Sequence, residues 1–121
     1  MNHQRRVDGQ TRPRWSMSGP VFIIQTTLPS SWKEFEVGSF SQHLVETGAA
    51  CVHRSTIESM YRWGGKIESS SEWSLEIKVS SDKKEDVLEK IKELHPYEIP
   101  QILHWQVETS EEYGFWVKNA D

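Results

Sequence analysis

Apolar and polar residues alternate over fourteen consecutive positions in the middle of the chain, from residue 66 to residue 79. Every even-numbered position is polar, and the odd-numbered positions are Ile67, Ser69, Ser71, Trp73, Leu75, Ile77 and Val79. A period of two is typical of a β-strand with one buried face, and at ~3.3 Å per residue this strand would span roughly 46 Å. Gly64-Gly65 before it is a two-residue hairpin signal, and Ile57–Trp63 supplies the partner strand. The pattern predicts one long β-hairpin.

A hairpin of this length has to project beyond the core of a small domain, because an average strand has only ~5–6 residues. Tyr61, Trp63 and Ile67 fall at its tip. An isolated two-stranded arm is marginally stable in water, and its exposed edges invite aggregation. We therefore expect the arm to pair with another subunit, so that the protein is an oligomer.

The rest of the chain alternates between strand and helix patterns. β-rich runs predict a strand at Val21–Leu28, the start of a second strand at Ala50–His53, and a last strand at Ile102–Glu108. Apolar residues at helical spacing predict three helices: one capped by Ser30 or Ser31 and running to about Thr47, one opened by Asp82 with Glu85 and stopped by Pro96, and one opened by Thr109 with Glu112. The order is βαββαβ plus a C-terminal helix, which is an α+β, ferredoxin-like arrangement.

Charge is unevenly spread along the 121 residues. Residues 1–20 hold four arginines and one aspartate, with no apolar periodicity, and predict a disordered basic tail before a single domain at 21–121. That domain carries ten basic and seventeen acidic residues, which argues against nucleic acid as a partner. No apolar run approaches the ~18 residues of a membrane helix, so we expect no membrane partner.

The single cysteine, Cys51, cannot form an internal disulfide. A cysteine without an internal disulfide partner fits a reducing compartment, and we expect a cytoplasmic protein. Small and apolar neighbours, Ala49, Ala50 and Val52, favour a buried structural thiol over a nucleophile or ligand. The chain also lacks a GxSxG elbow, a P-loop and a GxGxxG motif, so we expect no enzymatic activity and no organic cofactor.

The segment HPYEIP at residues 95–100 holds the remaining candidate chemistry. His95 and Glu98 are residue types that bind copper, zinc or nickel, but two ligands are too few for a tight site. Cys51, His53 or His104 could complete it from the same chain or a neighbouring one. The alternative is structural: Pro96 and Pro100 stiffen a corner, and Tyr97 and Glu98 bond to the backbone at a subunit boundary.

Several stretches together resemble the CutA family of divalent-cation tolerance proteins. They are ACVH at 50–53, SMYRWGGKIE at 59–68, Glu72 followed by Leu75–Lys78, HPYEIPQI at 95–102, and Tyr113 with Trp116. The resemblance spans residues 21–119. It implies a homotrimer in which long hairpins interlock, a shape related to the PII signalling proteins, and an association with divalent metal, copper first.

The resemblance also extends the candidate site. The expected metal set is His95, Glu98 and Cys51. The resemblance itself implies a copper site made by the histidine of HPY with a cysteine that some members carry on the first strand, and that strand has Gln25 here. The resemblance also implies an intersubunit cleft lined by Tyr61, Trp63, Lys66, Lys78 and Tyr97. Two alternatives remain open: a PII-like sensor that binds a small anion in this cleft, and a non-catalytic trimeric scaffold for a partner protein.

Overall fold

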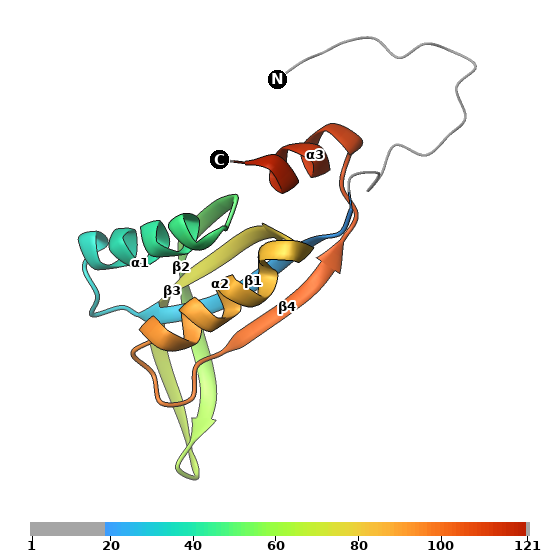
Figure 1. The fold of residues 1–121 in the computed structure, drawn as a ribbon. Helices are drawn as coiled ribbons and strands as arrows, with labels where there is room; N and C mark the ends of the chain where they lie inside the picture. The colour runs from blue at the N-terminus through green and yellow to red at the C-terminus, as the bar shows by residue number, and fades with distance from the viewer. Residues whose placement is uncertain (1–18, 121) are drawn as a thin grey trace.

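The computed structural model describes residues 19–120 and contains one four-stranded antiparallel sheet with three helices (Figure 1). The predicted basic tail lies outside the described residues, apart from Gly19 and Pro20. The elements are β1 (Val21–Pro29), α1 (Glu34–Thr47), β2 (Cys51–Trp63), β3 (Lys66–Ser80), α2 (Ser81–Leu94), β4 (Ile102–Val107) and α3 (Glu111–Asn119). The strand order is β2-β3-β1-β4, with β2 and β4 at the edges. The predicted ferredoxin-like order is confirmed.

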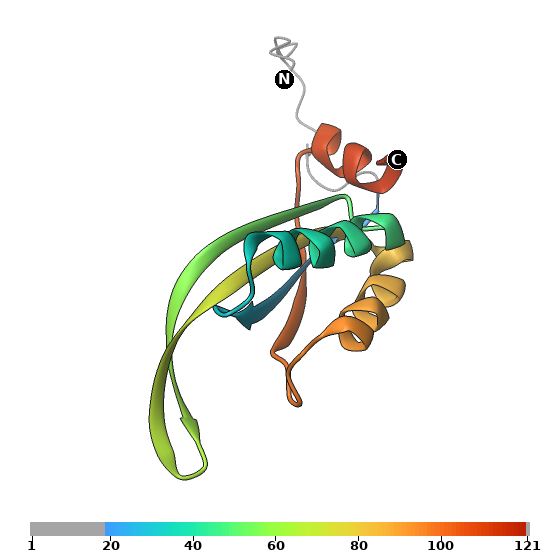
Figure 2. The ribbon, with the colours of Figure 1, turned by 90° about the vertical axis from the view of Figure 1, so that its left-hand side faces the viewer.

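The helices α1 and α2 pack against each other and against one face of the sheet (Figure 2). The buried apolar side chains of β3 are those at the odd-numbered positions Leu75, Ile77 and Val79, as the period of two predicted. They meet Ile24 and Leu28 of β1. Val37, Phe40 and Leu44 of α1 and Val87, Leu88 and Ile91 of α2 complete the core. Helical and strand periodicities therefore point to the same core.

The predicted hairpin is present, and its strands β2 and β3 are longer than β1 and β4. Trp63 pairs with Lys66, and Gly64 and Gly65 turn the chain with φ of 60° and 78°, values that glycine adopts readily. β1 pairs with β3 from Ser80 as far as Glu72. Beyond that point two strand segments, Glu58–Trp63 and Lys66–Ser71, pair only with each other among the described residues. We call these two segments with their turn the arm; it extends away from both helices (Figures 1 and 2).

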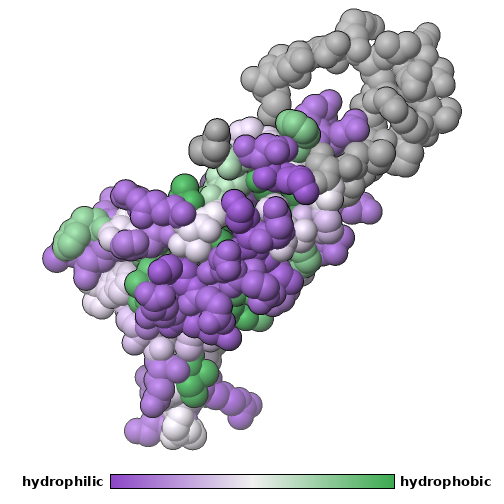
Figure 3. All heavy atoms as spheres, in the orientation of Figure 1, coloured by the Kyte–Doolittle hydropathy of each residue, from purple (hydrophilic) through white to green (hydrophobic). Residues whose placement is uncertain are grey.

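The other face of the sheet, opposite α1 and α2, carries large exposed side chains. Register places Trp105 and Leu103 of β4, and Ile57 of β2, on this side. Their exposed fractions are 41%, 50% and 37%. Among the described helices, α3 contacts one end of this side, through β1 and β3. We call this side the open face. In the view of Figure 3 hydrophilic residues predominate over the helical layer, with small hydrophobic patches between them, and the arm shows one hydrophobic patch among hydrophilic residues.

Several predicted boundaries need correction. β2 runs unbroken from Cys51, whereas the sequence pattern left residues 54–56 unassigned. These polar residues belong to the strand because backbone pairing with β3 does not depend on their side chains. β4 ends at Val107, one residue early.

The helix starts also differ from the predictions. α1 is capped by Lys33, whose backbone N–H donates to the Glu36 carboxylate at 2.8 Å, and not by Ser30 or Ser31. α2 follows Ser80, whose hydroxyl donates to the Asp82 carboxylate at 2.6 Å and is the main reason the pKa of Asp82 lies below its usual value. Ser110, and not Thr109, caps α3 and accepts from the Tyr113 N–H. Each prediction chose a neighbouring capping residue, because side-chain type alone does not fix where helical backbone begins.

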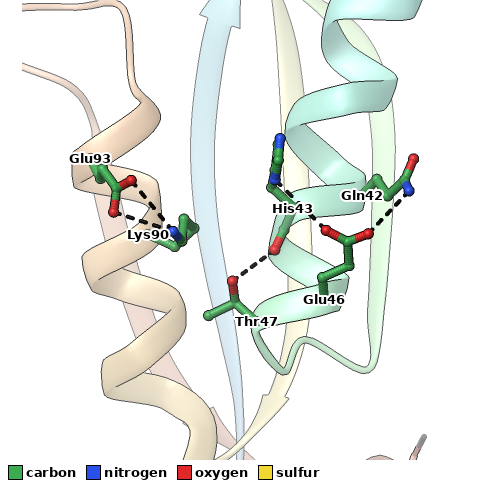
Figure 4. A network of polar contacts seen from close by, with 6 residues as sticks. All are labelled: Gln42, His43, Glu46, Thr47, Lys90 and Glu93. Atoms are coloured by element: carbon green, nitrogen blue, oxygen red, sulfur yellow. Dashed lines mark hydrogen bonds and ion pairs between the residues drawn. The ribbon is translucent and has the colours of Figure 1, made fainter.

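Polar contacts on the outer surface of α1 and α2 run along each helix (Figure 4). The residues involved are Gln42, His43, Glu46 and Thr47 on α1 and Lys90 and Glu93 on α2. Pairs spaced by three or four residues on an exposed helix stabilise it by about 0.2–0.5 kcal/mol each. These contacts explain why the outer surface of the two helices is polar, and we assign them no part in a binding site.

Candidate functional site

The His95 side chain points into the protein and connects the start of the HPYEIP segment to β1 by hydrogen bonds. Its Nε2 lies 2.8 Å from the Thr27 carbonyl oxygen, so Nε2 carries the proton and donates it. Its Nδ1 lies 3.2 Å from the backbone nitrogen of Tyr97, so Nδ1 has the lone pair and accepts. Burial lowers the pKa of His95, against the opposing effects of the Thr27 carbonyl and Glu72. The imidazole is therefore neutral at pH 7, and both its nitrogens are used.

Thr26 fastens the other end of the same segment. It is fully buried, and its hydroxyl donates to the Gln101 carbonyl oxygen at 2.6 Å. The Thr26 hydroxyl oxygen also lies 3.1 Å from His95 Nε2, so His95 shares its proton between this hydroxyl and the Thr27 carbonyl. The segment is thus held at both ends by adjacent residues of β1, and the prolines between them limit how far it can bend.

Tyr97 and Glu72 form the third attachment, between the segment and β3. The Tyr97 hydroxyl donates to one carboxylate oxygen of Glu72 at 2.8 Å, and the Ser59 hydroxyl donates to the other at 2.8 Å. Burial, and then the bond to Glu72, raise the pKa of Tyr97 well above its usual value. Tyr97 therefore stays a hydrogen-bond donor throughout the physiological range, and its ring is fixed relative to the arm.

A cavity of about 620 Å³ lies between the segment and the arm. Its lining is Thr27, Ser59, Met60, Tyr61, Trp63, Glu72, Tyr97, Glu98, Ile99 and Gln101. Figure 2 shows the arm curving beside the 95–101 segment. Of the described residues, those that line it include three aromatic rings and two carboxylates but no lysine or arginine. The cavity is acidic and aromatic.

Four of the predicted residues, Tyr61, Trp63, Tyr97 and Glu98, meet in this cavity. Lys66 pairs with Trp63 at the turn of the arm but does not line the cavity. Lys78 lies at the other end of the hairpin, paired in register with Cys51. The predicted cleft residues therefore divide into two groups.

The surroundings of Lys78 form a separate polar cluster on the open face. Its ammonium lies 3.0 Å from Nδ1 of His53 and 2.8 Å from the Glu76 carboxylate. A second cavity, of about 450 Å³, is lined by Lys78, Tyr113 and neighbouring residues of β1 and β4. Cys51 is half-buried in the protomer, less enclosed than its apolar neighbours suggested.

The predicted metal set is not assembled within one protomer. His95 contacts the end of β1 at Thr26 and Thr27, whereas Cys51 opens β2 beside Lys78. Across residues 19–120, no three histidine, cysteine, aspartate or glutamate side chains group closely enough to hold a metal ion. A cation on His95 Nδ1 would have to displace the Tyr97 N–H. Glu98 is exposed at the cavity and is the most accessible member of the set.

Sequence reasoning missed the residues that hold the segment in place. They are Thr26, Thr27, Ser59, Glu72 and Gln101. One signal was available: Thr26 occupies an inward-facing position of an apolar strand, where a hydroxyl needs a partner. Nothing in the spacing of Ser59 or Glu72 points to Tyr97, which is brought to them by the tertiary fold.

Among the residues that the structure describes, no helix has the length and apolar character needed to cross a membrane. A family described as "CutA1 divalent ion tolerance protein" matches residues 22–120. The divalent-cation tolerance protein CutA of Thermotoga maritima is 31% identical over 101 residues, covering 83% of this chain and 98% of the relative.

Solved structures agree with this match. CutA from Synechococcus elongatus PCC7942 superposes with a TM-score of 0.74 at 29% identity, covering 82% of this chain and 88% of that one. A protein from Nostoc sp. PCC 7120, described as "PII-like protein CutA", superposes with a TM-score of 0.71 at 31% identity, covering 82% and 95%. The sequence match spans nearly all the described residues, and the fold agrees with it. The chain belongs to the CutA1 divalent ion tolerance family.

Proposed function

We propose that this protein is a non-catalytic homotrimer that binds divalent cations, copper first. The observation that carries the assembly is the open face. Trp105, Leu103 and Ile57 stand exposed on the side of the sheet that α1 and α2 leave uncovered. Fully burying a large apolar side chain stabilises by about 1.5–3 kcal/mol, so covering this face with other subunits gives a substantial driving force for association.

The cation-binding part rests on the family and on the charge of the cavity. Relatives carry the name of divalent-cation tolerance proteins. The cavity offers the carboxylates of Glu72 and Glu98, which are suitable oxygen ligands. Copper prefers imidazole as well, and His95 becomes available if the segment releases the Tyr97 N–H from Nδ1. Cys51 would have to come from a neighbouring subunit.

The first test is the mass in solution. Light scattering should give three times the 14.1 kDa protomer mass at micromolar concentration. The variant Trp105→Glu places a charge on the open face and should dissociate the assembly. Phe115→Glu is the matched control, because Phe115 is 62% exposed on α3 and should leave the mass unchanged. A wild-type mass of one protomer would refute the trimer.

The second test is calorimetric titration with copper(II) at pH 7.5. Glu98→Gln and His95→Ala should each weaken binding by at least tenfold, about 1.4 kcal/mol, while the mass of the assembly stays unchanged. If titration of the wild-type protein released or absorbed no heat of binding, copper binding would be refuted, and the proposed trimer would be unaffected. Equal affinities in wild type and His95→Ala would assign His95 to structure alone.

The anionic alternative has less support. A bound anion needs a cationic partner, and neither Lys66 nor Lys78 lines the cavity beside Tyr97. No observation favours the scaffold for a partner protein over the proposed function. A cytoplasmic location remains a prediction from the single cysteine, tested by fractionation of the source cells.

A further inference from the structure

We propose that the basic segment of this chain, residues 1–18, docks on the outer flank of α3 around Phe115. The inference goes beyond divalent-cation binding and rests on neither the metal nor the trimer. Three observations carry it: the direction in which Phe115 points, the place where the described chain begins, and the opposite charges of the segment and the flank.

Phe115 points away from the side of the sheet that the proposed trimer covers. Gly114 and Val117 are the buried residues of α3 and face the protein. Tyr113 lines the cavity on the open face, and Trp116 stacks on its ring. Phe115 follows Tyr113 by two positions, which is about 200° around a helix with ~3.6 residues per turn. Phe115, 62% exposed, therefore lies on the opposite flank, which association through the open face would not cover.

The described chain begins on this same flank of α3. A Cβ built on Gly19 would lie 3.9 Å from the Lys118 ammonium nitrogen, so Gly19 is a neighbour of the last turn of the helix. Lys118 follows Phe115 by three positions, and residues at this spacing share one side of a helix. The Pro20 carbonyl accepts from the Ser81 N–H at 3.2 Å, which ties this point to the start of α2. The segment before Gly19 therefore starts within one helical turn of Phe115.

The length of the segment is sufficient for docking. An extended chain spans at most ~3.3–3.6 Å per residue, so Arg14 reaches roughly 17 Å from Gly19 and Arg12 roughly 24 Å. The nine residues of α3 extend over about 14 Å at a rise of ~1.5 Å per residue. Both arginines can therefore reach any position on the outer flank of the helix.

The segment and the flank have complementary chemistry. The segment carries four arginines and one aspartate. The first turn of α3 carries Glu111 and Glu112, and Glu111 precedes Phe115 by four positions, so that the two are neighbours on the helix. Lys118 opposes an arginine, but it interacts electrostatically with Asp82. A guanidinium group pairs with carboxylates and stacks on aromatic rings, and this flank offers both to one arginine.

The covalent link makes this segment a better occupant than a free partner. A segment joined so close to its site has an effective concentration on the order of millimolar, so a few weak contacts suffice to dock it. Such a contact is released on heating before the domain unfolds, because ordering the segment costs conformational entropy. The thermal midpoint therefore does not report docking, and the measurement belongs at room temperature.

Trypsin cleavage of the full-length protein at the bond between Arg14 and Trp15 measures docking, because a docked segment is cut only when it is released. Mass spectrometry follows the loss of residues 1–14. Phe115→Ser should raise the cleavage rate roughly two- to fivefold, the range for loss of one cation–ring contact at an exposed site. The double variant Glu111→Gln, Glu112→Gln should also raise it, and high salt should reduce its difference from wild type.

Phe35→Ser is the matched control, because Phe35 is a phenylalanine at the start of α1 that is 71% exposed. It should leave the cleavage rate unchanged. Equal rates in wild type and Phe115→Ser would overturn the proposal and leave this flank to a partner outside the chain. An equal increase in Phe35→Ser, or an unchanged rate in the double glutamine variant, would also overturn it. Protection that grows with protein concentration would assign the docked segment to a second molecule and overturn docking within one chain.

Discussion

Replacing Tyr97 by phenylalanine removes one hydroxyl and leaves the ring in place. The lost hydrogen bond is the 2.8 Å contact with the Glu72 carboxylate. Hydrogen bonds to charged groups contribute about 1.5–3 kcal/mol to stability. Both side chains are half-buried, so water can replace the hydroxyl on Glu72 in the variant. We therefore expect the lower end of this range, a loss of about 1.5 kcal/mol in the free energy of unfolding per protomer.

Urea denaturation at one fixed protomer concentration measures this loss, since the proposed association would make stability depend on concentration. Tyr97→Phe, Glu72→Ala and the double variant close a cycle with the wild type, and the coupling energy should be about 1 kcal/mol. Tyr61→Phe is the matched control: its hydroxyl is 3.4 Å from the Ser70 hydroxyl on the exposed arm, and its removal should cost under ~0.5 kcal/mol. A coupling energy below ~0.3 kcal/mol would refute the attachment of the segment to β3.

Three further predictions follow from the same structure. The pKa of His95 is lowered in the folded protein, so His95 of the unfolded chain takes up its proton first as pH falls. The free energy of unfolding should therefore decrease below pH ~6.5. The variant His95→Gln should show a weaker pH dependence of this free energy, measured by urea denaturation. Gly48→Ala should destabilise by about 1–3 kcal/mol, because φ is 138° and the new Cβ would lie 3.0 Å from Lys83 Cβ, whereas Gly38→Ala inside α1 should stabilise by about 0.5–1 kcal/mol. A raised thermal midpoint in Gly48→Ala, or a lowered one in Gly38→Ala, would contradict this reasoning. Deleting residues 1–18 should leave assembly and thermal midpoint unchanged, and a lower midpoint would show that they contribute to stability.

The hairpin could be predicted from the sequence because each of its signals is local. Alternation from residue 66 to residue 79 fixes which side of β3 is buried, and Gly64-Gly65 fixes the turn and with it the register. The helix starts were less accurate, since Ser30, Ser31 and Thr109 are good capping residues that lie beside the actual starts. A cap depends on backbone geometry, which residue type influences but does not determine.

The candidate site could be predicted only in its residue types. The motif HPYEIP drew attention to Tyr97 and Glu98, and the hairpin pattern drew attention to Tyr61 and Trp63, which line the same cavity. The orientation of His95 could not be predicted, since an imidazole can point to solvent as a ligand or inward as a structural donor. The inward orientation is decided by a carbonyl of Thr27, 68 positions away in the chain. The separation of Cys51 from His95 likewise follows from sheet register over distances that sequence spacing does not reveal.

The thirteen-residue edge strand β2 has a consequence for how long the protein survives. A protomer that left the proposed trimer would expose this edge together with the open face, and unpaired edges recruit other chains. In that assembly the species prone to aggregation would be a folded protomer, which forms without any unfolding. The lifetime of the protein would then be set by the rates at which subunits dissociate and reassociate, and a half-life measured after dilution would describe it better than the melting temperature of a single chain.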